Sequence, residues 1–251
     1  MPNHTPWRHK WPHLPHPTKE QFLACRRRRF GRYNPDLVTS PFLDFMVRTR
    51  AEPFWLRELY GWDPDGCSTH GEKDETAIWS FDRIGQTVSL YLGIYRIHIG
   101  GEHDDWYDPD FLIYNDVIVE GPSDEVSIYG YPRDVFPPTD FHSATIITDD
   151  EQDVPRDLPD SVLIIGGLGY EADREFWKTP IYRLDLGTME ICELETSGDT
   201  PGWIHGHRAA LIKGGKIFLS GGKILNAENE FCENEERFEL DLWTRVWRRS
   251  T

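Results

Sequence analysis

Three short apolar stretches of this chain each run directly into a pair of glycines. They are Ile97-His98-Ile99 before Gly100-Gly101, Val162-Leu163-Ile164-Ile165 before Gly166-Gly167, and Ile217-Phe218-Leu219-Ser220 before Gly221-Gly222. A short apolar run that stops at glycine is typical of a buried strand ending in a turn. Because the arrangement occurs three times, the sequence predicts an internal repeat of strand units.

The residues around the second and third glycine pairs also match. Upstream lie Phe141-His142-Ser143-Ala144 and Gly206-His207-Arg208-Ala209, and downstream lie Ile181-Tyr182-Arg183-Leu184-Asp185-Leu186-Gly187-Thr188 and Phe238-Glu239-Leu240-Asp241-Leu242-Trp243-Thr244. Each unit therefore reads as strand, turn, strand ending in Gly-Gly, polar loop, strand, turn, strand. Four short strands per repeat are expected of a β-propeller blade.

This pattern resembles the kelch repeat, whose blades pair a double glycine with a downstream tyrosine and tryptophan. The third copy has Trp247 near the tryptophan position, whereas the second has Ile191-Cys192 there. The resemblance implies a mainly β fold, a kelch-like propeller-type array of about three recognisable blades over residues 76–251. Propellers typically close with four to eight blades, so either a degenerate fourth blade is not recognised or an α-helical N-terminal cap covers an open array. The use of atypical end units in repeat proteins favours the cap.

The glycine pairs are better explained by chain geometry than by nucleotide binding. A strand that turns tightly against neighbouring backbone needs residues that accept positive φ. A phosphate-binding loop would instead open a helix, but Gly169-Tyr170 is followed by acidic Glu171 and Asp173 with no helical pattern. The sequence therefore argues against a nucleotide site, and we expect no cofactor.

The first 75 residues have a different texture and form the predicted cap. Thr18-Lys19-Glu20-Gln21 has the form of a capping box, and Ser40-Pro41 is typical of a helix start. Residues 54–60 have helical spacing up to Gly61. We expect the dense aromatic side chains of this region to pack the helices onto the sheets.

Charge is divided unevenly along the chain. Residues 1–50 hold ten Lys and Arg against three Asp and Glu, about +7, which leaves 17 against 40, about −23, for the remainder. The Arg26–Arg29 run is of a kind that contacts phosphates. The acidic body would repel a polyanion, however, so we expect this basic segment to dock on the body or on an acidic partner, and nucleic acid is disfavoured as a partner.

Composition limits the remaining classes. The chain is 38% hydrophobic, enough for a core, but has no apolar run long enough to span a membrane, and its first residues lack an apolar signal-peptide core. Four scattered cysteines without a CxxC indicate neither a zinc knuckle nor a disulfide framework. We expect a cytoplasmic protein without membrane partners.

The acidic stretch 101–110 is the candidate for metal binding. It holds Glu102, His103, Asp104 and Asp108, whose oxygens suit a hard cation. Its spacing does not match an EF-hand loop, and its aspartates could equally satisfy the backbone of a solvated turn. The stretch supports one alternative function, a metal-dependent hydrolase or lyase that uses this loop and nearby histidines.

His142 and His207 occupy the same position in successive copies. Equivalent positions bring the two rings into similar surroundings, so a hydrogen bond between neighbouring blades explains them without a metal. No carboxylate is suitably placed beside them, and no G-x-S-x-G signature is present. We therefore expect His142 and His207 to have a structural role, and the sequence assigns no catalytic residue.

The segments that connect one blade to the next are the candidates for partner binding. They carry Tyr131, Arg133, Phe136, Trp203 and His205, residue types enriched at binding hot spots. The same side chains could instead wedge adjacent blades together, and the sequence leaves both options open. A third loop, 149–159, is acidic and proline-bearing, and we expect it to be a mobile surface insertion.

These features favour a protein-binding module of the kelch type with an unknown protein partner. Its net charge of −16 suggests a basic partner, as an acidic immunity or neutralising protein would have. The metal-dependent enzyme is the alternative.

Overall fold

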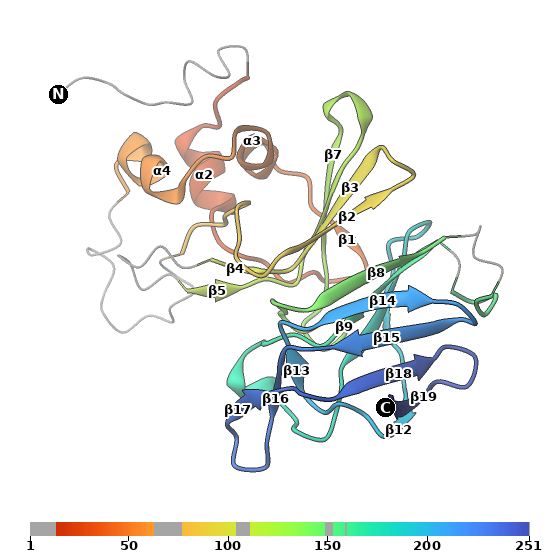
Figure 1. Cartoon of the computed structure of the whole chain (residues 1–251). Coiled ribbons are helices and arrows are strands. Elements are labelled where there is room, and N and C mark those ends of the chain that lie inside the picture. Colours follow the sequence, from red (N-terminus) through yellow and green to blue (C-terminus); the bar gives the residue numbers. More distant parts are fainter. Residues whose placement is uncertain (1–13, 63–76, 104–110, 149–152, 159, 251) are drawn as a thin grey trace.

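The computed structural model describes residues 14–62, 77–103, 111–148, 153–158 and 160–250. The fold is mainly β, with several antiparallel sheets and few helices, all of the latter near the N-terminus (Figure 1). The helices are α2 (Lys19–Cys25), α3 (Pro41–Thr49) and α4 (Pro53–Tyr60). The short 3-10 turns η3 (Pro122–Asp124) and η4 (Glu171–Asp173) lie in connections.

Three sheets repeat one four-stranded antiparallel meander. The first contains β2 (Thr87–Tyr91), β3 (Tyr95–Ile99), β6 (Val117–Glu120) and β7 (Val126–Gly130), with β1 (Asp36–Leu37) added beside β7. The second contains β8 (Ser143–Ile147), β9 (Ser161–Ile165), β10 (Ile181–Asp185) and β11 (Ile191–Glu193). The third contains β14 (Arg208–Ile212), β15 (Lys216–Ser220), β18 (Arg237–Asp241) and β19 (Val246–Ser250), with β12 (Ser197–Gly198) beside β19.

Two smaller sheets are formed by the connections. One joins β4 (Glu102–His103) to β5 (Leu112–Ile113), and the other joins β13 (Ile204–His205), β16 (Lys223–Leu225) and β17 (Phe231–Glu233). The first strands of the three large sheets, β2, β8 and β14, lie next to one another in that order. We call this inner edge of the array the hub.

Each glycine pair follows the second strand of its sheet, which confirms the predicted repeat. All six glycines have positive φ, from 56° at Gly100 to 133° at Gly167. A Cβ on Gly100 or Gly166 would overlap the carbonyl oxygen of Thr139 or of Ile204, which belong to the connection that enters the next sheet. At Gly221 a Cβ would meet nothing within 4 Å. Two of the pairs therefore let the following repeat approach the strand end closely.

The histidines join neighbouring sheets, as their repeat position predicts. His142 Nε2 lies 2.7 Å from Thr87 Oγ1 of the first sheet, and His207 Nε2 lies 2.9 Å from Ser143 Oγ of the second. In the third sheet the position of these hydroxyls is held by Arg208, which is exposed. Burial lowers the pKa of His142 to about 3 and that of His207 to about 4, so both rings are neutral.

Apolar clusters fill the contacts between sheets, which we call seams. The first seam packs Ile97, Ile99 and Val117 against Val162 and Ile164. The second packs Leu163 and Ile165, from the opposite face of β9, against Ile217, Leu219, Phe238 and Trp247. Because both faces of β9 are covered, all five of its residues are buried. A central strand with two buried faces reads as a continuous apolar run, as Val162–Ile165 does.

The helices cover the remaining face of the first sheet. Ile118 and Ile128 of that face share a cluster with Phe22 of α2 and Phe42 and Met46 of α3. The predicted start signals hold: the Thr18 side chain forms the capping box, and Ser40 Oγ accepts from the Leu43 N–H. The helical cap and the first sheet therefore share one core.

Part of the basic segment lies against this core and against the second repeat. Arg26 is buried with its guanidinium 4.1 Å from the Trp62 ring centroid. The Arg28 guanidinium donates to the Ile113 carbonyl and, over 3.0 Å, to Tyr170 Oη. Arg26 and Arg28 therefore contact an indole ring, a carbonyl and a tyrosine hydroxyl of the same chain.

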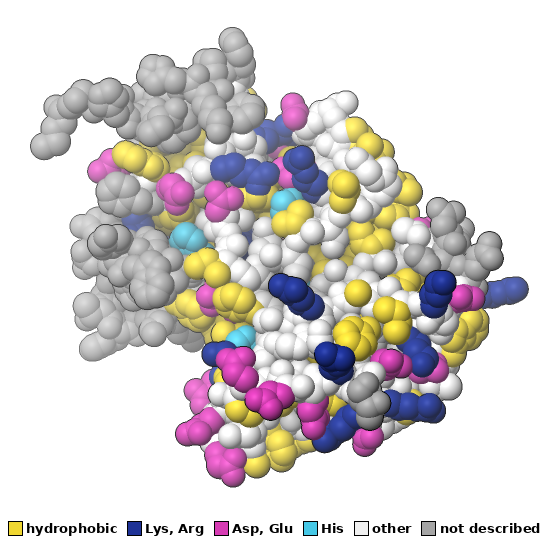
Figure 2. Space-filling view, viewed as in Figure 1, with side chains coloured by type: hydrophobic (Ala, Val, Ile, Leu, Met, Phe, Trp, Pro, Cys, Tyr) yellow, Lys and Arg dark blue, Asp and Glu magenta, His cyan; other side chains and the backbone are white. Residues whose placement is uncertain are grey.

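One loop is more buried than the sequence predicts, and one part of the first sheet is left exposed. Loop 149–159 is not wholly a surface insertion, because Val154 and Leu158 are buried in the second seam; residues 149–152 and 159 lie outside the described part. On the first sheet, hydrophobic side chains gather over the β2–β3 hairpin beside the cap (Figure 2), where Val88, Leu90 and Leu92 are exposed.

Candidate binding surface

Two of the predicted surface anchors are core residues, which corrects the expectation of binding at those positions. Tyr131 and Phe136 are fully buried in the first seam. Their rings make an edge contact at 5.8 Å, Phe136 makes another with Tyr182 at 5.2 Å, and the Tyr131 hydroxyl donates to the Met189 carbonyl over 2.8 Å. These side chains wedge the first and second sheets together, the packing role that the sequence left open.

Arg133 and Trp203 are brought to one surface cavity. This cavity has a volume of about 560 Å³ and also includes Lys178 and Tyr182 in its lining. Trp203 is mostly buried and donates from Nε1 to the Leu168 carbonyl over 3.2 Å. Arg133 is half-exposed and pairs with Asp173 at 2.9 Å. Arg133 and Trp203 therefore line the same cavity, Trp203 as a buried side chain and Arg133 as a half-exposed one.

His205 lies away from this cavity. Its ring is half-buried between Phe141, at 6.2 Å, and Phe231, at 4.6 Å, both in edge contacts. Burial, followed by the positive charges of Lys223 and Arg174, lowers its pKa. A neutral ring between two aromatics suits packing of the small β13–β16–β17 sheet.

The connection between β9 and β10 forms the wall of a second cavity. The start of this connection is held near the hub, because buried Asp140 accepts a hydrogen bond from the Gly169 N–H through Oδ1 over 2.7 Å. Arg174 donates to the carbonyls of Leu168 and Gly169 over 3.0 and 2.9 Å. Beyond this fixed base, Trp177 projects into solvent with 63% of its surface exposed.

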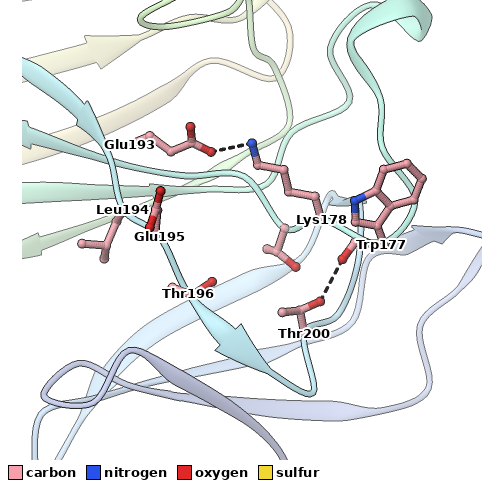
Figure 3. A pocket seen from close by; sticks show the side chains of 8 residues that line it. Trp177, Lys178, Glu193, Leu194, Glu195, Thr196 and Thr200 are labelled. Carbon is pink, nitrogen blue, oxygen red and sulfur yellow. Dashed lines mark hydrogen bonds and ion pairs between the residues drawn. The ribbon is translucent and has the colours of Figure 1, made fainter.

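The second cavity lies on the other side of Lys178 and has a volume of about 400 Å³ (Figure 3). Trp177 and Lys178 stand on one side, and the strand end Glu193-Leu194-Glu195 stands on the other. Lys178 Nζ spans the gap to Glu193 at 2.6 Å, and Thr200 Oγ1 donates to the Trp177 carbonyl over 3.2 Å. We call the two cavities together the Lys178 groove.

Charge in the Lys178 groove is mainly negative. Its lining holds Asp134, Asp173, Glu175, Glu193 and Glu195 but only two basic residues, Arg133 and Lys178. Both bases are already in ion pairs, Arg133 with Asp173 and Lys178 with Glu193. The groove therefore presents an exposed indole beside carboxylates whose charge is only partly compensated.

Sequence reasoning missed Trp177 and the groove around it. The available signal was Phe176-Trp177, two adjacent aromatics within a polar connection between two strands. Arg133 and Trp203 lie in the connections between repeats, whereas Trp177 lies in a connection within the second repeat.

Only two of the four candidate metal ligands lie among the described residues. Glu102 and His103 form β4, and Asp104 and Asp108 lie outside the described residues. Among the described residues, no group of three His, Cys, Asp or Glu side chains could hold a metal ion. Cys25, Cys192 and Cys232 are free thiols, and Cys67 lies outside the described part.

No described helix is both long and apolar enough to cross a membrane. No family model matches the chain, and no curated protein matches it. Among solved structures it is similar to one titled as that of YjhT, with a TM-score of 0.47 and 11% sequence identity. The match covers 66% of this chain and 55% of the other, so this chain spans just over half of that structure's length.

Proposed function

We propose that this chain is a protein-binding module of the kelch type and that its partner contacts the Lys178 groove. The repeated four-stranded sheets with Gly-Gly after each second strand support the kelch-type part of the proposal. The observation that supports binding is the position of Trp177, 63% exposed on a connection whose base is fixed. Tryptophan is one of the residue types enriched at the hot spots of protein interfaces.

The rigidity of the surroundings favours binding over chance exposure. The Trp177 connection rests on buried Asp140, and the opposite wall follows β11, which pairs with β10 over three residues. Because one wall continues a strand and the other is hydrogen-bonded at Gly169 and at the Trp177 carbonyl, less conformational entropy is lost when a partner binds.

Capture with immobilised full-length protein tests this proposal. Wild type, Trp177→Ala and Trp243→Ala are compared as baits in the native extract. Trp243 is the matched control, because it is 59% exposed but lies in the β18–β19 turn. We expect a protein that wild type and Trp243→Ala recover equally and Trp177→Ala recovers at least about ten-fold less, because loss of a hot-spot residue costs about 2 kcal/mol or more.

The proposal is wrong if Trp177→Ala recovers the same proteins in the same amounts. Equal thermal unfolding of the three proteins establishes that a loss of capture is not a loss of folding. Among the described residues, no group of three His, Cys, Asp or Glu side chains favours the metal-dependent hydrolase or lyase, and Asp104 and Asp108 lie outside the described part.

A further inference from the structure

The Lys178 groove has a chemistry that suits one kind of partner segment. Resting on the proposed function, we propose that the groove takes a basic peptide segment, in which an arginine stacks on Trp177 and further basic side chains meet Glu175 and Glu195.

The carboxylates of the groove exceed its cations by three. Five acidic side chains line it, against Arg133 and Lys178. Each base is held by one carboxylate, at 2.9 Å for Arg133 and 2.6 Å for Lys178. Within the described residues, Asp134, Glu175 and Glu195 make no ion pair. All three are exposed, and together they favour a segment with several positive charges through a salt-dependent attraction.

The exposed indole adds a surface for a planar cation. Trp177 makes an edge contact with Phe176 at 5.1 Å, and both rings are exposed. Arginine stacks on tryptophan faces through cation–π contact and is less strongly hydrated than lysine. Figure 3 shows Glu195 on the opposite side of the cavity from Trp177. An arginine between these walls would meet an aromatic face and a carboxylate together.

Lys178 already supplies a cation to the groove, at the carboxylate of Glu193 that an incoming arginine would meet. Its ammonium group bridges the groove to Glu193, and both side chains are about two-fifths exposed, at 41% and 42%. Such exposed ion pairs contribute little stability. An incoming arginine can therefore replace Lys178 at Glu193 at small cost, and removal of Lys178 should strengthen binding of a basic segment. An acidic segment would need Lys178, so the sign of this effect identifies the partner's charge.

Fluorescence anisotropy with two labelled peptides tests the proposal on the full-length chain. One peptide repeats Gly-Arg-Gly-Ser three times, and the other carries glutamate in place of each arginine. We expect the arginine peptide to bind and the glutamate peptide to show no saturable binding. Binding should weaken as salt is added, because exposed charges contribute most of the attraction.

Groove variants separate local binding from attraction to an acidic chain. Trp177→Ala should weaken arginine-peptide binding about ten-fold and Glu195→Gln about three-fold, whereas Lys178→Gln should strengthen it about two- to five-fold. Trp243→Ala and Glu235→Gln are the controls, since both residues are exposed and line neither cavity. Each control should change the dissociation constant less than two-fold.

Three results would overturn the proposal: no preference for the arginine peptide, equal effects of Glu195→Gln and Glu235→Gln, or weaker binding after Lys178→Gln. Its failure can be told apart from failure of the proposed function. If a partner is captured in a Trp177-dependent way but the arginine peptide does not compete with it, the binding module stands and the basic segment does not. If no Trp177-dependent partner is captured, the proposed function fails whatever the peptides do.

Discussion

The second and third sheets are built from the same repeat but have different neighbours. In the second sheet every residue of β9 is buried, because the first and third sheets cover its two faces. In the third sheet β15 alternates, with Ile217 and Leu219 buried and Lys216 and Ser220 only half-buried. The outward face of the third sheet holds the Lys216–Glu239 ion pair at 3.0 Å and the exposed side chain of Arg248.

This difference shows how the outer faces of the first and third sheets are kept from exposing apolar surface. A terminal repeat needs a polar outer face or a cover, since its apolar face would otherwise be exposed. The third sheet has the polar face, whereas the first has the helical cap over Ile118 and Ile128. At the hub of the third sheet, Arg208 occupies the position that Thr87 and Ser143, with hydroxyl side chains, occupy in the two earlier repeats. If the distinction is right, changes at the covered faces should cost more stability than changes at the free face.

The largest effect is expected when the cover is removed. Deletion of residues 1–60 would expose Ile118 and Ile128 together with the rest of the face beneath the helices. We expect the truncated chain to aggregate, because an exposed apolar sheet face has no partner in water. Size-exclusion chromatography and thermal unfolding measure this. A truncated chain that stayed soluble, monomeric and equally heat-stable would refute the cap.

The next largest effect is expected at a seam glycine. Gly166 has φ of 68°, and a Cβ there would overlap the Ile204 carbonyl and lie 2.8 Å from the His207 ring. Gly166→Ala combines left-handed strain with overpacking of the second seam, so we expect a loss of about 3–5 kcal/mol in the free energy of unfolding. Urea unfolding at neutral pH measures it. A loss below 1 kcal/mol would show that the seam can move away from the strand end.

A comparable effect is expected from acid at the hub. Burial lowers the pKa of His142 to about 3 and of His207 to about 4, below the ordinary value of 6.5. Both rings stay neutral in the folded chain, so their contribution is fully present above pH 6.5 and is lost as the pH falls toward 4 and 3. We expect the free energy of unfolding to fall by about 2 kcal/mol for each ring, about 4 kcal/mol in all, between pH 7 and pH 5.

A substitution within the repeat provides the control for this pH dependence. The first repeat has Gln86 where the others have histidine, so His142→Gln copies a residue that the fold already uses there. This variant should retain a bond to Thr87 and reduce the loss of stability in acid. Buried Asp140 opposes the trend, because burial raises its pKa and favours the fold at low pH. An unchanged slope in His142→Gln would place the acid sensitivity elsewhere.

Much of the fold could be predicted because each feature had a local cause. The Asp-Leu-x-Thr turns are one example: Asp185 accepts from Gly187 and Thr188, and Asp241 from Trp243 and Thr244. The register also shows that Ile191 and Trp247 are equivalent, since they pair with Leu184 and Leu240. Turns and strand ends depend on residues close in sequence, so one chain is enough to identify them.

The candidate site could be predicted only in part because burial depends on distant residues. Tyr131 and Arg133 are two residues apart, but the first faces a seam and the second faces solvent. Which side chain is covered depends on where the second sheet packs, and composition does not show this. Val154 and Leu158 were missed for the same reason, since an acidic loop was not expected to fill a seam.

The substitution Gly221→Ala tests most directly whether the strand end of the third sheet is free of neighbouring backbone. Gly221 has φ of 67°, nearly the 68° of Gly166, but no atom lies within 4 Å of its added Cβ. The free-face account predicts a loss in unfolding free energy of only about 1–2 kcal/mol, the cost of the left-handed conformation alone. A loss as large as that of Gly166→Ala, measured by urea unfolding under the same conditions, would contradict it.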